Sequence, residues 1–226
     1  MKVYLFDQSS VKIQLKDFFV NEKASINNFG STVNQTFEAH VFANVIKWYK
    51  DNGWTVNIIN PIKNGQQVFT LKFNTRGAPI NYSYAHCEKK GYSCQIRHGL
   101  RTHTESYKNS NNKSANIVCD IVIMDDINID SFSTDSALQN DLLIAFGEVK
   151  HMSAYAELIA SFIGLVHELK PEKLKRIRMK KWKRSENISC FLYVSGILYK
   201  TAEGLVETIE KRKYDVDIYS FNNPMN

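Results

Sequence analysis

The chain has 226 residues, of which 43% are hydrophobic, and its formal net charge is +6. This length and apolar content predict one domain with a sizeable core. No apolar run approaches the length of a membrane span, and the opening residues, MKVYLFDQSSVKIQLKD, are charged and interrupted. We therefore expect no signal peptide and no membrane partner, but a cytoplasmic protein. Neither a Walker A motif nor a GxGxxG is present, so ATP and dinucleotides are not expected as cofactors.

The first element with a clear pattern is a helix that follows an N-terminal extension at 1–32. Over Val33–Asp51, apolar residues recur every three or four positions, which predicts an amphipathic helix. Glu38 lies one turn before Phe42 and two turns before Val45, so it shares the inward side of this helix. Spacing alone fits an edge residue of the polar face equally well. Glu38 is therefore a candidate acidic residue that faces the interior.

Short strands follow this helix, and a long irregular segment comes after them. Residues 54–59 alternate between apolar and polar, and Asn64-Gly65 predicts a hairpin turn into a strand at 67–73. The segment 74–115 has little periodicity and is too long for a simple connection, so we interpret it as an inserted loop or hairpin that contacts the substrate. Its candidate phosphate or base contacts are Arg97, His98 and Arg101.

The same segment also leaves a zinc site open as an alternative. Cys87, Cys94, His98 and His103 are the ligand types of a tetrahedral zinc site, although the six residues between the two cysteines exceed the usual two to four. A substrate-contacting loop is the favoured interpretation, and structural zinc is the second. The remaining cysteines lie inside apolar strands and are expected to be reduced core thiols.

Two apolar runs carry acidic residues where buried strands usually have none. The run 116–124 (NIVCDIVIM) reads as a strand covered on both faces, yet Asp120 lies in its middle. In the run 142–150 (LLIAFGEVK), Glu148 and Lys150 share one side, because side chains two apart on a strand do so. If the two runs pair, Asp120 meets Glu148 across the ladder. This predicts a divalent-metal site of two carboxylates with a lysine beside it.

The elements after Lys150 predict the fold class. An apolar stripe up to Leu169 indicates a helix that Pro171 stops, and 188–194 reads as another buried strand. A strand, helix, strand unit of this kind requires a right-handed crossover and a parallel pair. A further helix and a short last strand complete the C-terminal region, 200–226. We predict an α/β protein with a mixed central β-sheet and helices on both faces.

Positive charge is concentrated in the segment 170–184 (KPEKLKRIRMKKWKR), which has nine Lys or Arg residues and one Glu. Its charge of +8 leaves the rest of the chain at −2, because the total is +6. Such a segment suits a phosphate backbone, with Trp182 available for stacking on a base, and a solvated linker is the other interpretation. The candidate nucleic-acid contacts are Lys180, Lys181, Trp182, Lys183 and Arg184.

These motifs resemble those of the PD-(D/E)XK nucleases, which have a restriction-endonuclease-like fold. Asp120 matches the first acid of that family, Glu148-Val149-Lys150 matches its ExK motif, and Glu38 matches the acid that its first helix often carries. The resemblance covers a core at about 33–199 and implies a single nuclease domain, with 74–115 as an insertion.

The resemblance implies an endonuclease that hydrolyses DNA, most simply double-stranded DNA, with Mg²⁺ or Mn²⁺. Asp120, Glu148 and the carbonyl of Val149 would hold the metal with help from Glu38. Lys150 would orient the attacking water or help to deprotonate it, and would stabilise the charge of the transition state. The family also suggests a homodimer or a partner subunit. Two rivals remain, namely a non-catalytic nucleic-acid-binding subunit on the same fold and a zinc-stabilised regulator.

Overall fold

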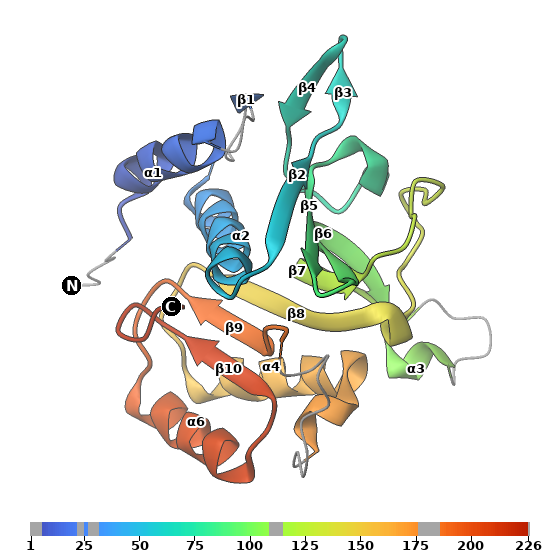
Figure 1. Cartoon of the computed structure of the whole chain (residues 1–226). Helices are drawn as coiled ribbons and strands as arrows, with labels where there is room; N and C mark the ends of the chain where they lie inside the picture. The colour runs from blue at the N-terminus through green and yellow to red at the C-terminus, as the bar shows by residue number, and fades with distance from the viewer. Residues whose placement is uncertain (1–5, 22–24, 27–31, 109–114, 176–185, 226) are drawn as a thin grey trace.

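A computed structural model describes residues 6–21, 25–26, 32–108, 115–175 and 186–225 of the chain (Figure 1). In this part, seven strands form one sheet in the order β10-β9-β8-β7-β6-β5-β2. The strands β8, β9 and β10 pair in parallel, and the others pair antiparallel, so the predicted mixed sheet is confirmed. Their bounds are β2 Thr55–Ile59, β5 Tyr84–Lys89, β6 Tyr92–His103, β7 Asn116–Asp125, β8 Leu143–Lys150, β9 Cys190–Val194 and β10 Val216–Tyr219.

Helices cover both faces of this sheet. Figure 1 shows α1 and α2 on one side and α4 and α6 on the other, as the sequence predicts. The helices are α1 Gln8–Asn21, α2 Val33–Asp51, the short α3 Glu105–Lys108, α4 Ala156–Leu169 and α6 Lys200–Arg212, with 3₁₀ turns η1 Pro79–Asn81, η2 Asn140–Leu142 and η3 Pro171–Leu174. A smaller sheet joins β1 Ser25–Ile26 and β3 Ile62–Lys63 to the two sides of β4 Gln66–Phe69.

The helix α2 has the bounds that its apolar periodicity predicts. Thr32 caps its N-terminus, because its hydroxyl accepts a hydrogen bond from the backbone of Gln35 at 3.3 Å. Its inner face is buried and packs toward β8 of the sheet, where Gly147 lies against the ring of Phe191. A Cβ at Gly147 would overlap the ring of Phe191, so only glycine fits there. The packing of α2 holds Glu38 over the ends of the central strands.

Of the loop or hairpin expected at 74–115, the structure forms a hairpin in the middle of the segment, and this hairpin is part of the central sheet. Residues 84–103 form β5 and β6, and β6 lies inside the sheet between β5 and β7. The sequence pattern fails because β6 buries polar residues, which interrupt its alternation: Gln95, Arg97, His98 and Thr102 are all almost fully covered. The hairpin predicted at Asn64-Gly65 is present between β3 and β4, and both of its turn residues have positive φ.

The C-terminal half agrees with the predicted crossover. β8 leads through α4 to β9, and the two strands pair in parallel from Gly147↔Phe191 to Lys150↔Val194. α4 packs its apolar stripe on the sheet, with the ring of Phe162 at 5.8 Å from that of Phe146. None of the helices in the described ranges combines the length and the apolar character that crossing a bilayer requires.

Candidate active site

The proposed acidic residues meet where the pairing of β7 and β8 ends. The ladder runs from Met124↔Leu143 to Ile121↔Gly147, so Asp120 and Glu148 are the next residues on each strand. The backbone N–H of Val149 donates to Oδ2 of Asp120 at 2.8 Å. Since the N–H and C=O of one strand residue point to the same side, the Val149 carbonyl also faces β7. Asp120 therefore faces two backbone groups of the ExK segment.

A glycine accommodates this irregular point on the other side of β7. Gly99 lies opposite Asp120, between the pairs His98↔Ile121 and Leu100↔Cys119. Its φ of +66° belongs to the left-handed region, and a Cβ there would lie 2.5 Å from the carbonyl oxygen of Lys72. The chain thus makes a local break in β6 beside the acidic residue.

Lys150 bridges the two carboxylates that the sequence singles out. Its Nζ lies 3.4 Å from Oδ2 of Asp120 and forms a close ion pair with Oε1 of Glu148. The side chains of Asp120 and Glu148 are 21% and 14% exposed, and that of Lys150 is 38% exposed. The predicted group of two carboxylates and one ammonium is therefore assembled, partly buried but open to solvent on the lysine side.

Glu38 approaches this group from α2 and contacts a buried histidine. Its Oε2 lies 3.3 Å from Nε2 of His98, whose side chain is 2% exposed. The other ring nitrogen, Nδ1, lies 2.8 Å from the carbonyl oxygen of Lys72. A carbonyl only accepts, so Nδ1 carries a hydrogen and Nε2 is the ring atom that faces the carboxylate. Within the described residues, this contact does not have hydrogen-bond geometry, and no other group makes a hydrogen bond to the buried Nε2.

Burial and mutual repulsion make the carboxylates costly to keep ionised. Burial raises the pKa of Asp120, and nearby Glu38 adds to the rise, while Lys150 and the Val149 N–H oppose it. Burial also raises the pKa of Glu148, followed by repulsion from Asp120. Burial alone would lower the pKa of Lys150, but the two carboxylates outweigh it and leave its pKa above the ordinary value. Lys150 is thus held as an ammonium, which disfavours its expected role in deprotonating water.

The donor set suits a hard divalent cation. Asp120 and Glu148 flank the Lys150 ammonium, and Glu38 lies near enough to raise the pKa of both carboxyl groups. Carboxylate and carbonyl oxygens are the ligands that Mg²⁺ and Mn²⁺ prefer. As they stand, no three His, Cys, Asp or Glu side chains in the described ranges are arranged to hold a metal ion. Binding of a metal ion would therefore require a rearrangement. Either Lys150 moves away from Glu148, or the carboxylates turn toward one another.

Two of the predicted phosphate or base contacts are interior residues. Only 5% of Arg97 and 5% of His98 is exposed, so that prediction is wrong for both. Arg97 lies over the ring of Tyr84 at 3.9 Å and donates from Nε to Gln95, and burial lowers its pKa to about 10. Arg101 is half-buried and donates to Asn116 at 2.6 Å, and its contact with nucleic acid stays a prediction.

The four candidate zinc ligands do not converge. Cys87 and Cys94 face each other across β5 and β6 as buried free thiols. His98 and His103 lie four and nine residues further along β6, and a strand rises about 3.3 Å per residue. His103 is therefore about 30 Å from Cys94, and its ring stacks on Tyr107 instead. The four side chains cannot share one ion.

The basic segment 170–184 is described only up to Lys175. Lys170 and Lys173 are buried and form ion pairs within the fold. Lys170 lies 2.7 Å from Glu172, and Lys173 lies 2.6 Å from Asp215. Lys180, Lys181, Trp182, Lys183 and Arg184 lie outside the described residues.

Sequence reasoning missed the link between His98 and Glu38. His98 was expected to contact substrate, and instead its imidazole contacts the acid on α2. No local pattern in the sequence signals this contact between a strand and a helix. Comparison of the chain with protein-family models, with curated proteins and with solved structures gives no match.

Proposed function

We propose that this chain is a metal-dependent DNA endonuclease with a PD-(D/E)XK centre on a restriction-endonuclease-like core. The observation that carries the proposal is the bridging of Asp120 and Glu148 by Lys150 where β7 and β8 part. Glu38 on the preceding helix and the parallel crossover to β9 supply the supporting context. In this reaction water attacks phosphorus, the P–O bond to the sugar breaks, and a phosphate end and a hydroxyl end remain.

The carboxylates and the Val149 carbonyl would hold Mg²⁺ or Mn²⁺, which would supply a more acidic water and offset negative charge at phosphorus. The side chains of the site would position the metal ligands and stabilise the transition state. The Val149 N–H orients Asp120, and Glu38 lies against the ring of His98. Lys150, an ammonium with an open side, would donate hydrogen bonds to the phosphate oxygens and stabilise the charge that builds on them.

A cleavage assay tests this function. Supercoiled, linear, single-stranded and branched DNA are incubated with the purified chain in Mg²⁺, Mn²⁺ or EDTA, beside Glu148→Ala and Lys150→Ala. We expect cleavage only with metal and only by the parent chain, with both variants folded. Cleavage in EDTA, or full activity of Lys150→Ala, would end the proposal. Tight binding of DNA without cleavage would instead favour the non-catalytic binding subunit.

The basic segment is the proposed electrostatic contact with DNA, and its salt dependence is measurable. If about five of its cations meet phosphates, the log of affinity falls with the log of salt with a slope of roughly −4 to −5. We expect a variant with glutamine at Lys180, Lys181, Lys183 and Arg184 to flatten this slope by several units on all sequences alike. An unchanged slope would mark the segment as a solvated linker.

A further inference from the structure

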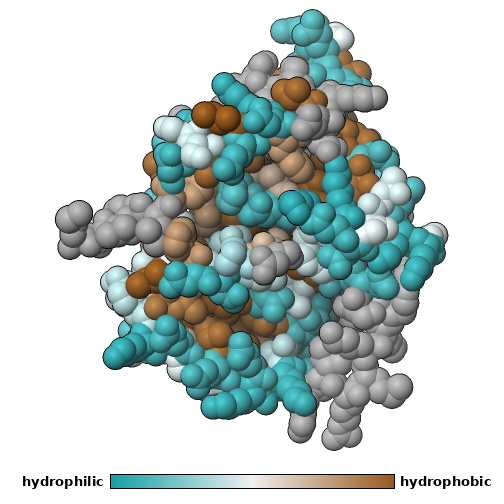
Figure 2. Space-filling model, turned by 60° about the vertical axis from the view of Figure 1, so that its left-hand side comes forward, coloured by the Kyte–Doolittle hydropathy of each residue, from teal (hydrophilic) through white to brown (hydrophobic). Residues whose placement is uncertain are grey.

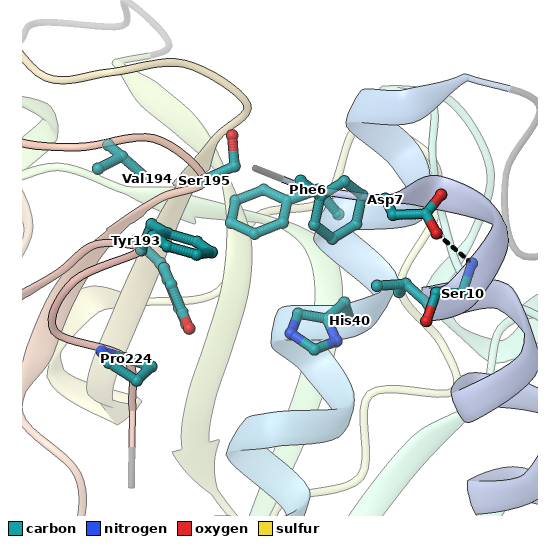
Figure 3. A pocket seen from close by; sticks show the side chains of 11 residues that line it. Phe6, Asp7, Ser10, His40, Tyr193, Val194, Ser195 and Pro224 are labelled. Atoms are coloured by element: carbon teal, nitrogen blue, oxygen red, sulfur yellow. Dashed lines mark hydrogen bonds between the residues drawn. The ribbon is translucent and has the colours of Figure 1, made fainter. Parts of the chain in front are cut away.

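An aromatic pocket lies beside the candidate centre, between the end of β9 and the helices α1 and α2 (Figure 3). It encloses about 380 Å³, which is within the usual range for small-molecule sites, roughly 300–1,000 Å³. Phe6, Phe37, Tyr193 and Phe221 contribute aromatic rings, and Phe37 makes edge contacts with Phe6 at 5.1 Å and with Tyr193 at 5.5 Å. The pocket is therefore built from rings that hold one another in place.

The pocket and the candidate centre share two stretches of backbone. Phe37 directly precedes Glu38 on α2. On the other wall, the N–H of Ser195 donates to the carbonyl of Lys150 at 3.1 Å, and the Ser195 hydroxyl lies 2.8 Å from Nδ1 of His151. The pocket thus lies close, along the backbone, to residues that are proposed to hold the phosphate and the metal.

The chemistry of the lining selects the kind of ligand. The lining residues, all in the described part of the chain, include no lysine or arginine, so the pocket does not suit a phosphate. The one carboxylate among them, Asp7, accepts hydrogen bonds from the first turn of α1. Burial lowers the pKa of His40, which keeps its ring neutral. A flat, uncharged ring with hydrogen-bonding edges fits these walls.

We propose that this pocket takes one unstacked nucleobase from the nucleotide next to the cleaved phosphate. The inference rests on the proposed nuclease function and adds that the preferred DNA carries an unpaired or extruded base at the cut. Aromatic side chains stack on any base, so the pocket selects for the exposed state of the base more than for its identity. His40 and Ser195 supply polar groups near the edge of the base. Figure 2 brings this side of the molecule forward and shows apolar side chains exposed among hydrophilic ones.

Binding to two matched duplexes tests the pocket without cleavage. One short fluorescein-labelled duplex carries a single extruded thymidine, and the other carries an abasic nucleotide at the same place. Anisotropy titrations in EDTA give the two dissociation constants for the full chain. We expect the thymidine duplex to bind about 5- to 150-fold more tightly, the range for stacking one base on an aromatic ring.

Two variants assign this preference to the pocket. Phe221 is 47% exposed, so Phe221→Ala removes one wall of the pocket with little risk to folding. Ser10 lies at the exposed rim of the pocket, so Ser10→Trp places an aromatic ring inside it. Each should bring the ratio of the two constants near one and leave affinity for the abasic duplex unchanged. Tyr107→Ala, an exposed aromatic on α3, is the matched control and should keep the ratio.

The outcomes separate this inference from the nuclease proposal. Equal affinity of the parent chain for both duplexes, or a ratio that survives in both pocket variants, would overturn the base pocket even if Mg²⁺-dependent cleavage is observed. A ratio that the variants abolish, in a chain that never cleaves DNA, would keep the base pocket and reject the nuclease. Failure to bind either duplex would reject both.

Discussion

Replacing Lys150 with methionine tests the electrostatics of the candidate centre. The substitution keeps the apolar stem of the side chain and removes the charge that bridges Asp120 and Glu148. Breaking a fully buried ion pair costs about 3–5 kcal/mol, and exposed pairs contribute about 0–1 kcal/mol. Because the lysine is 38% exposed, we expect an intermediate loss of about 1–2 kcal/mol at pH 7. For a chain of this size, that lowers the Tm by about 2–8 °C.

The pH dependence of this loss gives the sharper result. The pKa values of Asp120 and Glu148 are raised in the folded state, chiefly by burial, so the fold binds their protons more tightly than the unfolded chain does. Their contribution to stability is therefore fully present below the ordinary carboxyl pKa values, near 4, and is lost as the pH rises through the folded pKa values. Removing Lys150 raises both pKa values further. The difference in Tm between Lys150→Met and the parent chain should shrink as the pH falls from 7 toward 4.

Thermal unfolding followed by circular dichroism at a series of pH values measures this difference. Lys47→Met is the matched control, because Lys47 is 65% exposed and pairs with Asp51 on the outer surface of α2. Its effect should stay below about 0.5 kcal/mol. A Tm difference for Lys150→Met that is the same at every pH, or no larger than that of the control, would refute the reasoning.

Three further predictions concern stability. Glu148→Gln should raise the Tm at neutral pH, because it removes a buried carboxylate whose pKa is raised by burial and by Asp120, and a lowered Tm in thermal melts would count against this. Gly147→Ala should lower the free energy of unfolding by about 1–3 kcal/mol in urea titrations, since its Cβ meets the buried ring of Phe191, and a neutral effect would contradict the packing. Cys87→Ser should cost about 1–3 kcal/mol through core polarity alone, with the Tm of the parent chain unchanged by EDTA, whereas a Tm that falls in EDTA would restore the zinc interpretation.

The sequence predicts those parts of the fold whose hydrophobic periodicity is regular. The bounds of α2 and the parallel pairing of β8 with β9 follow from apolar spacing and from the crossover rule. The strands β5 and β6 could not be predicted in the same way, because β6 buries the polar side chains of Arg97 and His98. Burial of polar side chains breaks the alternation that marks a strand.

The candidate site is predictable only in part for the same reason. Asp120, Glu148 and Lys150 stand out because acidic residues interrupt apolar runs and their spacing places them on neighbouring strands. The contact of His98 with Glu38 joins a strand to a helix sixty residues earlier, and nothing local signals it. The aromatic pocket gathers residues from both ends of the chain, so only the folded arrangement reveals it.

Plasmid cleavage by the isosteric variant Asp120→Asn tests the central claim most directly. The parent chain, Asp120→Asn and the surface control Asp141→Asn, whose side chain is 80% exposed, are compared in Mg²⁺ at equal concentration. We predict that the parent chain and Asp141→Asn convert supercoiled plasmid to nicked or linear DNA, and that Asp120→Asn does not, although its Tm is equal or higher. Cleavage by Asp120→Asn at the rate of the parent chain, or cleavage by none of the three, would contradict the assignment of this centre.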